Sequence, residues 1–247
     1  MPNPFENLFK IEDVTDTAYL AASYRARESK HMDPHFRVPL ERSLKNLTIG
    51  VPDEIDAAFE WTLSVRTPII DQMLLSILPG GFDTVVNLGC GFDTRPYRLK
   101  LPPSTHWIDV DLQSVIEAKN KLLKDEIPIC KVTRVALDLS KQDEVQTFFG
   151  QALSFGRFVV ITEGLLIYLT RQQVLTLTVG FMYRHNLTAW VTDLVSVDEV
   201  NRFLNLGWIL DRHYPYVSMG KAINRPAPKS IDQPGGDAVG IYAFTNK

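Results

Sequence analysis

Four short apolar segments each run into small or acidic residues, and these residue types suit the binding of a nucleoside. Gly89 and Gly91 follow the first segment, and Asp111, Asp138 and Glu163 stand at the ends of the next three. Glycine lets the backbone turn tightly and approach a ligand, whereas a carboxylate accepts hydrogen bonds from hydroxyl and amino groups. Taken singly, an acid at the end of a segment is more often a turn or cap residue. Four such ends in order favour a binding site.

The spacing of these residues indicates a chemical role for each. Asp111 follows Gly91 by 20 residues, the separation at which a carboxylate accepts from a ribose hydroxyl pair. Asp138 suits an adenine amino group, with Leu139 packed against the ring. Glu163 suits an ammonium group.

Two classes of cofactor compete for such a site. A dinucleotide favours a third glycine for close helix packing, but that position is Thr94, and the neighbouring Asp93 would disfavour a phosphate at a helix N-terminus. S-adenosylmethionine has no phosphate, and its carboxylate and ammonium need a cation and an anion, for which Arg66 and Glu163 are available. The residues therefore favour S-adenosylmethionine over the rival, a nicotinamide cofactor, which would also call for a catalytic Tyr-x-x-x-Lys pair.

These residues lie on segments that alternate between strands and helices. We expect helices over residues 15–29, 52–63, 65–78 and 114–125, and helix starts with capping boxes at Thr170 with Gln173 and at Ser196 with Glu199. The alternation predicts a largely parallel sheet covered on both faces, with its ligand outside the carboxyl ends of the strands. The expected strands cover residues 84–88, 105–110, 131–137, 157–162, 187–194, 208–214 and 239–244.

Length and composition predict one globular domain over residues 1–247. The sequence pattern divides it into a mostly helical part at 1–80 and a part at 81–247 in which strands and helices alternate. The chain has 45% hydrophobic and 22% charged residues and a net charge of −3, so we expect no nucleic-acid partner. Two cysteines are too few for a disulfide framework. We find neither a signal peptide nor an apolar run that would span a membrane, and expect a cytoplasmic protein without a metal.

Residues 87–99, which read Asn-Leu-Gly-Cys-Gly-Phe-Asp-Thr-Arg-Pro-Tyr-Arg-Leu, form a specific motif. It resembles the leucine carboxyl methyltransferase superfamily, in particular the polyketide (tetracenomycin-type) O-methyltransferase branch. The likeness continues at Val-Arg-Thr (65–67), Asp-Val-Asp (109–111), Asp-Leu (138–139) and Glu-Gly-Leu-Leu-Ile-Tyr-Leu (163–169), and covers about residues 15–210.

The resemblance implies a Rossmann-like class I methyltransferase fold, α/β, with a mostly parallel seven-stranded sheet and an N-terminal helical lid. It also implies S-adenosyl-L-methionine as cofactor and methyl transfer to a hydroxyl or carboxyl oxygen of a small, polyketide-like molecule. The alternatives are methylation of a protein C-terminal carboxylate and a cofactor-binding module without turnover. The oligomeric state cannot be read from the sequence.

Carried over by position, the resemblance implies roles for the matching residues. Arg66, helped by Arg25, would bind the methionine carboxylate, and Glu163 would lie near the methionine amino group. Gly89 and Gly91 would lie under the methionine part, Asp111 would hold the ribose, and Asp138 and Leu139 would frame the adenine. Cys90, Leu112 and Gly164 would be further cofactor-binding residues, and Tyr168 would lie near the acceptor.

Other polar residues favour structural roles. We interpret Asp93, Arg95 and Arg98 as an ion-pair cluster rather than ligand contacts, because opposite charges at such spacing commonly satisfy each other. His106 is expected in the core. The sequence assigns no catalytic residue: the candidate general bases His31, His35 and His213 are each more simply explained as surface residues.

Overall fold

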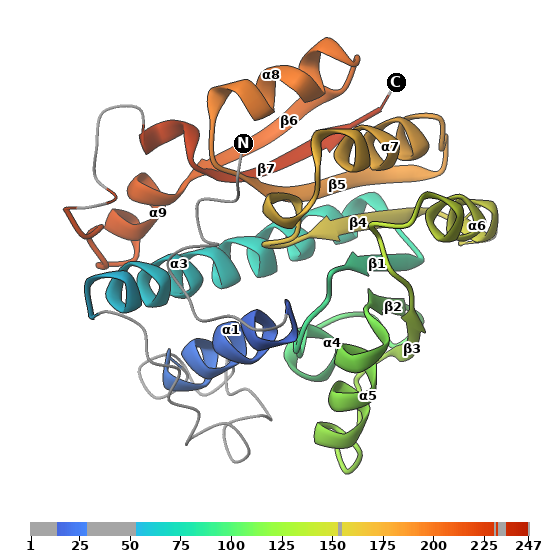
Figure 1. Ribbon diagram of the computed structural model, residues 1–247, viewed down its shortest axis with the longest axis horizontal. Coiled ribbons are helices and arrows are strands. Elements are labelled where there is room, and N and C mark those ends of the chain that lie inside the picture. Colours follow the sequence, from blue (N-terminus) through green and yellow to red (C-terminus); the bar gives the residue numbers. More distant parts are fainter. Residues whose placement is uncertain (1–13, 29–52, 153–154, 230, 232–235, 247) are drawn as a thin grey trace.

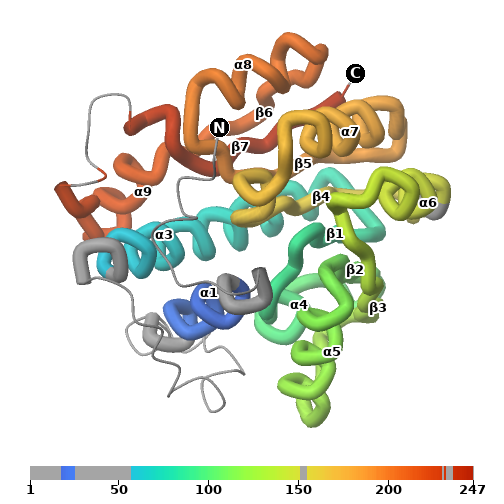
Figure 2. The backbone as a smooth tube through the Cα atoms, viewed as in Figure 1, coloured from blue at the N-terminus to red at the C-terminus, as the bar shows by residue number. Residues whose placement is uncertain are grey.

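The structure, a computed structural model, describes residues 14–28, 53–152, 155–229, 231 and 236–246 (Figure 1, and as a backbone tube in Figure 2). A seven-stranded sheet runs through its centre in the order β3-β2-β1-β4-β5-β7-β6. β7 is antiparallel to both of its neighbours and every other pairing is parallel, which confirms the predicted mostly parallel α/β sheet. The strands are β1 (Thr84–Leu88), β2 (His106–Asp111), β3 (Lys131–Ala136), β4 (Phe158–Thr162), β5 (Leu187–Leu194), β6 (Ile209–Pro215) and β7 (Gly240–Thr245).

Helices cover both faces of the sheet (Figure 1). One apolar core joins α3 and α9 to one face, and another joins α6, α7 and α8 to the opposite face. The helices are α1 (Val14–Glu28), α3 (Asp53–Ile77), α4 (Arg95–Arg98), α5 (Gln113–Leu122), α6 (Gln142–Ala152), α7 (Arg171–Met182), α8 (Val197–Asn205) and α9 (Tyr216–Ala222), with the 3-10 turns η2 (Leu78–Gly80), η3 (Leu166–Tyr168) and η4 (Gly236–Ala238).

The first strand shows why these segments form a central sheet. All five residues of β1 are buried, as expected of a continuous apolar run between two helical layers. Successive side chains point to opposite faces, so that Val86 packs with α6 and α7 while Val85 packs with α3. Thr84 and Asn87 are the polar residues of this strand, and the Asn87 side chain lies on the same face as that of Val85.

Two of the expected helices prove to be one. α3 is a single helix of 25 residues with Pro68 inside it, not a pair of helices with Pro68 in the first turn of the second. Proline removes one backbone hydrogen bond, but the flanking Val65, Ile69 and Ile70 are almost fully buried against the sheet. That burial holds the helix continuous.

The expected helix caps are found with one change. Thr170 and Gln173 form the predicted capping box at the start of α7. At α8, the Ser196 side chain accepts from the Glu199 backbone N–H, but the Glu199 carboxylate accepts from the Val195 backbone N–H at 2.8 Å. Ser196 and Glu199 therefore form a simple N-cap rather than the expected reciprocal box.

Candidate functional site

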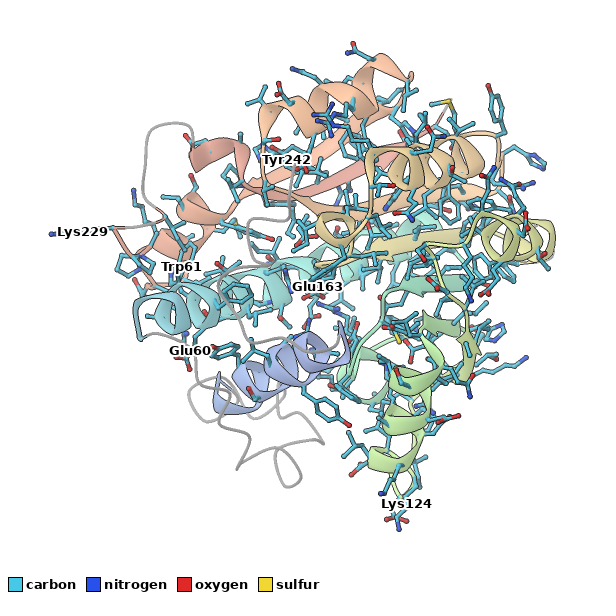
Figure 3. All side chains as sticks on the ribbon, in the orientation of Figure 1. Glu60, Trp61, Lys124, Glu163, Lys229 and Tyr242 are labelled. Carbon is cyan, nitrogen blue, oxygen red and sulfur yellow. The ribbon has the colours of Figure 1, made fainter. Side chains whose placement is uncertain are left out.

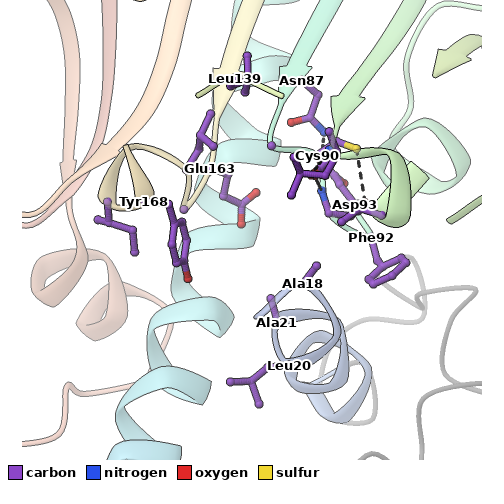
Figure 4. A pocket seen from close by; sticks show the side chains of 18 of the residues that line it. Ala18, Leu20, Ala21, Asn87, Cys90, Phe92, Asp93, Leu139, Glu163 and Tyr168 are labelled. Carbon is purple, nitrogen blue, oxygen red and sulfur yellow. Dashed lines mark hydrogen bonds between the residues drawn. The ribbon is translucent and has the colours of Figure 1, made fainter. Parts of the chain in front are cut away.

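A pocket of about 400 Å³ lies at the carboxyl ends of β1 to β4 and is closed by α1 and α3 (Figure 4). Its volume is within the range of small-molecule sites. It is lined by the predicted site residues Arg25, Arg66, Gly89, Cys90, Gly91, Asp111, Leu112, Asp138, Leu139, Glu163, Gly164 and Tyr168. The structure therefore brings every predicted site residue to one cavity, while the ligand contacts assigned to them stay predictions.

The glycine loop after β1 forms one wall of the pocket. Gly89 has a φ of +62°, and a Cβ at this position would lie 2.8 Å from Cδ1 of Leu165. Gly91 donates its backbone N–H to Asp111 Oδ2 at 2.7 Å, and Leu112 donates to Oδ1 at 2.8 Å. Burial raises the pKa of Asp111, and these two hydrogen bonds act against that rise. The loop and this carboxylate thus hold each other in place.

The segment after β3 presents a second carboxylate. The Ser140 hydroxyl and backbone N–H both donate to Asp138 Oδ1, at 2.6 and 2.9 Å. These hydrogen bonds, the side-chain one foremost, lower the pKa of Asp138, so this group is ionised at neutral pH. Leu139 beside it is buried and contributes an apolar wall.

Three guanidinium groups meet at Glu163, near the centre of the molecule (Figure 3). Its Oε1 accepts from Arg25 Nη2 at 2.5 Å and Arg66 Nε at 2.9 Å, and its Oε2 accepts from Arg95 Nη1 at 2.7 Å. Burial alone would raise the pKa of Glu163, but Arg25, Arg95 and Arg66 hold it well below its usual range. Glu163 is therefore a fixed anion with cations on both sides.

Asp193 on β5 is a site-supporting residue that the sequence analysis missed. It accepts from Arg66 Nη1 at 2.8 Å and from the Gly164 backbone N–H at 2.8 Å. It therefore orients the arginine and the turn after β4 together. The sequence does place Asp193 near the end of the fifth expected strand. The expectation that acids at strand ends line the site, which selects Asp111 and Glu163, would have selected Asp193 as well.

The predicted ion-pair cluster around Arg95 is confirmed. Arg95 contacts Asp93 at 2.6 Å and Asp71 on α3 at 2.6 Å, and Arg98 contacts Asp71 at 2.5 Å. Arg95 is fully buried. Asp71 was not foreseen, because no local spacing links it to the glycine motif. The cluster ties α3 to the loop that follows β1.

Cys90 and the histidines differ in where they lie. Cys90 lines the pocket, and burial raises the pKa of its thiol well above the usual value, so the thiol stays protonated.

His106 is only half-buried, at the start of β2, and its Nε2 lies 2.8 Å from Thr133 Oγ1, so its expected core position is wrong. His213 lies within β6, stacked on Tyr242 and away from the pocket lining. The other two candidate bases, His31 and His35, lie outside the described residues.

Within the described part of the chain, no three His, Cys, Asp or Glu side chains are grouped as metal ligands. No helix described there is long and apolar enough to cross a bilayer.

The model of the leucine carboxyl methyltransferase family matches residues 19–181, which include the whole glycine loop and the strand ends that line the pocket. The chain belongs to the leucine carboxyl methyltransferase family. The matched region also contains Arg25, Arg66 and Glu163, so this family's segment is the one that builds the site.

Several proteins with similar sequences carry provisional names as S-adenosyl-L-methionine-dependent methyltransferases. One from Mycobacteroides abscessus is 29% identical over 176 residues, which cover 64% of this chain and 58% of that protein. One from Streptomyces coelicolor is 29% identical over 171 residues, 64% of this chain and 60% of that protein. A third, from Streptomyces avermitilis, is 26% identical and covers 89% and 92%. The first two matches thus span about 60% of the relatives' length.

Proposed function

We propose that this chain is an S-adenosyl-L-methionine-dependent O-methyltransferase that acts on a small, largely apolar, polyketide-like acceptor. The observation that carries the proposal is the single pocket in which three strand-end carboxylates, the glycine loop and an arginine pair converge. Family membership and the names of the relatives support the same cofactor.

The cofactor's polar groups match the charges along the pocket. The Asp111 carboxylate, fixed by two backbone N–H groups, would accept from the ribose hydroxyls, and Asp138 with Leu139 would frame the adenine. The amino-acid end needs one anion and one cation. Glu163 would take the ammonium, and Arg66 with Arg25 would take the carboxylate, so that ligand contacts replace part of the arginine–glutamate pairing.

The remaining wall of the pocket suits an apolar acceptor. Leu20 and Ala21 on α1, Leu63 on α3, and Ile167 and Tyr168 on η3 line this side, and Figure 4 shows the Tyr168 ring reaching into the pocket. When bound, the cofactor would supply a methyl group for transfer to the acceptor oxygen. The cofactor supplies the electrophile, and the protein supplies orientation and, with α1 over the pocket, exclusion of water. A carboxylate acceptor would need no general base.

Calorimetric titration tests the cofactor assignment. We expect micromolar binding of S-adenosylhomocysteine, no binding of NAD or NADP, and affinity at least about tenfold lower in Asp111→Ala, because a half-buried hydrogen-bond acceptor is lost. Asp143→Ala, which removes an exposed acid on α6, is the matched control and should bind as wild type does. Binding of a nicotinamide cofactor in place of S-adenosylhomocysteine would contradict the proposal.

The family's description favours one alternative acceptor, a C-terminal leucine carboxylate of a protein. Transfer of a radiolabelled methyl group to a panel of phenols, aromatic acids and a leucine-terminated peptide separates the candidates. An ether product withstands alkali, whereas a methyl ester releases methanol. Labelling of the peptide alone would overturn the small-molecule acceptor. Cofactor binding with no labelled product from any acceptor or cell extract would favour a binding module without turnover.

A further inference from the structure

A buried ion pair lies outside the pocket and is joined to it by a chain of polar contacts. Lys119 of α5 and Asp109 of β2 are both fully buried, and Nζ lies 2.7 Å from Oδ2. Neither residue lines the pocket. Although burial disfavours the ammonium, the nearby Asp109 carboxylate raises the pKa of Lys119, so this lysine is charged.

The side-chain amide of Asn87, which is buried, connects this ion pair to the glycine loop. Asn87 and Asp109 are register partners on the adjacent parallel strands β1 and β2, so their side chains share a face of the sheet. Asn87 Nδ2 lies 3.4 Å from Asp109 Oδ1 and 3.0 Å from Asp93 Oδ2. One amide therefore bridges the ion pair and the carboxylate of the glycine loop.

From Asp93 the contacts reach the floor of the pocket. Arg95 Nη1 donates to Asp93 Oδ2 at 2.6 Å and to Glu163 Oε2 at 2.7 Å. Asp93 Oδ1 also accepts from the Arg95 backbone N–H at 2.9 Å. The orientation of Asp93 thus sets where Arg95 holds Glu163.

We infer that the Lys119–Asp109 pair is a positioning device for the pocket, acting through Asn87 on Asp93 and, by way of Arg95, on Glu163. The pair fixes the acceptor to which Asn87 is hydrogen-bonded, and Asn87 in turn fixes the loop carboxylate. Satisfied buried polar networks specify one arrangement, whereas a broken one frees its members. The part of the inference that concerns cofactor affinity rests on the proposed function.

Two double variants separate this role from simple stability. Asp109→Asn/Lys119→Met and Asp109→Leu/Lys119→Met both remove the two charges of the pair, and both leave Arg134, whose Nε lies 3.7 Å from Asp109 Oδ2, in place. Neutral replacements of a buried pair are often tolerated. They differ only at position 109, where asparagine keeps an oxygen for Asn87 and for the Trp107 indole N–H, which donates to Asp109 Oδ1 at 2.8 Å, and leucine keeps neither. Asn87→Leu leaves the Trp107 contact in place and so isolates the Asn87 link. Leu177→Ala, in the core on the opposite face, serves as a control for lost stability alone.

Hydrogen–deuterium exchange of the ligand-free protein is the first readout. In the leucine double variant we expect faster exchange in residues 87–95 than in wild type, whereas the asparagine double variant and Leu177→Ala keep the wild-type rate there. Affinity for S-adenosylhomocysteine is the second readout, with a loss of about tenfold or more expected only in the leucine double variant.

Equal exchange and equal affinity in the two double variants would overturn the inference. If wild type bound no S-adenosylhomocysteine, the proposed function would fail while the exchange data still decided this role. If the leucine double variant does not fold, Asn87→Leu is measured in its place, because it breaks the same chain of contacts and leaves the ion pair intact. If residues 91–95 of Asn87→Leu exchanged at the wild-type rate, the inference would also be overturned.

Discussion

At the scale of single residues, Glu163 is where three guanidinium groups from α1, α3 and α4 meet. The sequence predicted it as a ligand for an ammonium group because it ends a strand. Its arginine partners are separated from it by 68 to 138 residues, so no local pattern could have shown that they converge. Asp71 and Asp109 were missed for a related reason, since each pairs with a side chain of a different element, Arg95 and Lys119 respectively. A strand-end rule finds the acids, but not the long-range contacts that orient them.

The arginines around Glu163 predict a specific dependence of stability on pH. Because the folded-state pKa lies below the ordinary value of 4.5, the carboxylate stabilises the fold above that value. The contribution is lost as pH falls through the lower folded-state pKa. Glu163→Gln should destabilise the protein by about 3–5 kcal/mol near neutral pH by leaving buried cations unpaired. Urea unfolding of both proteins should show this difference shrinking below about pH 4.5; a constant difference down to about pH 3 would contradict the argument.

Gly89 gives a second prediction at this scale. Gly89→Ala places a Cβ 2.8 Å from Leu165 Cδ1 at a φ of +62°, a conformation that costs about 1–3 kcal/mol for a residue other than glycine. We expect a lower free energy of unfolding and weaker binding of S-adenosylhomocysteine. The matched control is Gly150→Ala in α6, where a Cβ has open space and should stabilise by about 0.5–1 kcal/mol. Urea unfolding measures both, and equal effects of the two substitutions would refute the steric account.

At the scale of elements, strands were easier to predict than helices. The seven expected strands agree with the observed ones to about a residue, because each is a short apolar run bounded by polar or turn residues. Helices α4, α6 and α9 were not predicted. α4 has only four residues, and α9 only seven, too few for helical periodicity to show. The sequence divides α3 at residue 64 and places Pro68 in the first turn of a second helix, because that local rule takes no account of the burial that keeps α3 continuous.

The capping box of α7 gives a prediction for an element. Thr170→Ala removes the side-chain oxygen that accepts from the Gln173 backbone N–H at 3.3 Å, and should cost about 0.5–2 kcal/mol. Thr176→Ala, inside the same helix, is the control and should be neutral or stabilising, since alanine is the better helix former. Thermal and urea unfolding of the two variants check this. If Thr176→Ala proved the more harmful, the cap would not explain where α7 begins.

At the scale of the whole molecule, the same sheet that forms the centre of the fold also carries the site. One sheet carries all the strand-end residues of the pocket, and both helical layers are buried against it. The alternation of strands and helices was enough to predict this architecture and the edge at which the pocket lies. The division into a lid over residues 1–80 and a core over residues 81–247 stays a prediction, because residues 29–52 lie outside the described part.

The charges joined around Glu163 have a consequence for ionic strength. Within the part of the chain that the structure describes, the ion pairs linked to Glu163 join four arginines to four acids, namely Arg25, Arg66, Arg95 and Arg98 with Asp71, Asp93, Glu163 and Asp193. The amino-acid end of the cofactor carries one positive and one negative charge, so its binding to these groups leaves the net charge of the site unchanged. Salt also screens buried ion pairs only weakly. The affinity for S-adenosylhomocysteine should therefore change by less than about twofold between about 50 and about 500 mM NaCl. A steep decline with added salt would mean that an exposed, unbalanced charge holds the ligand instead.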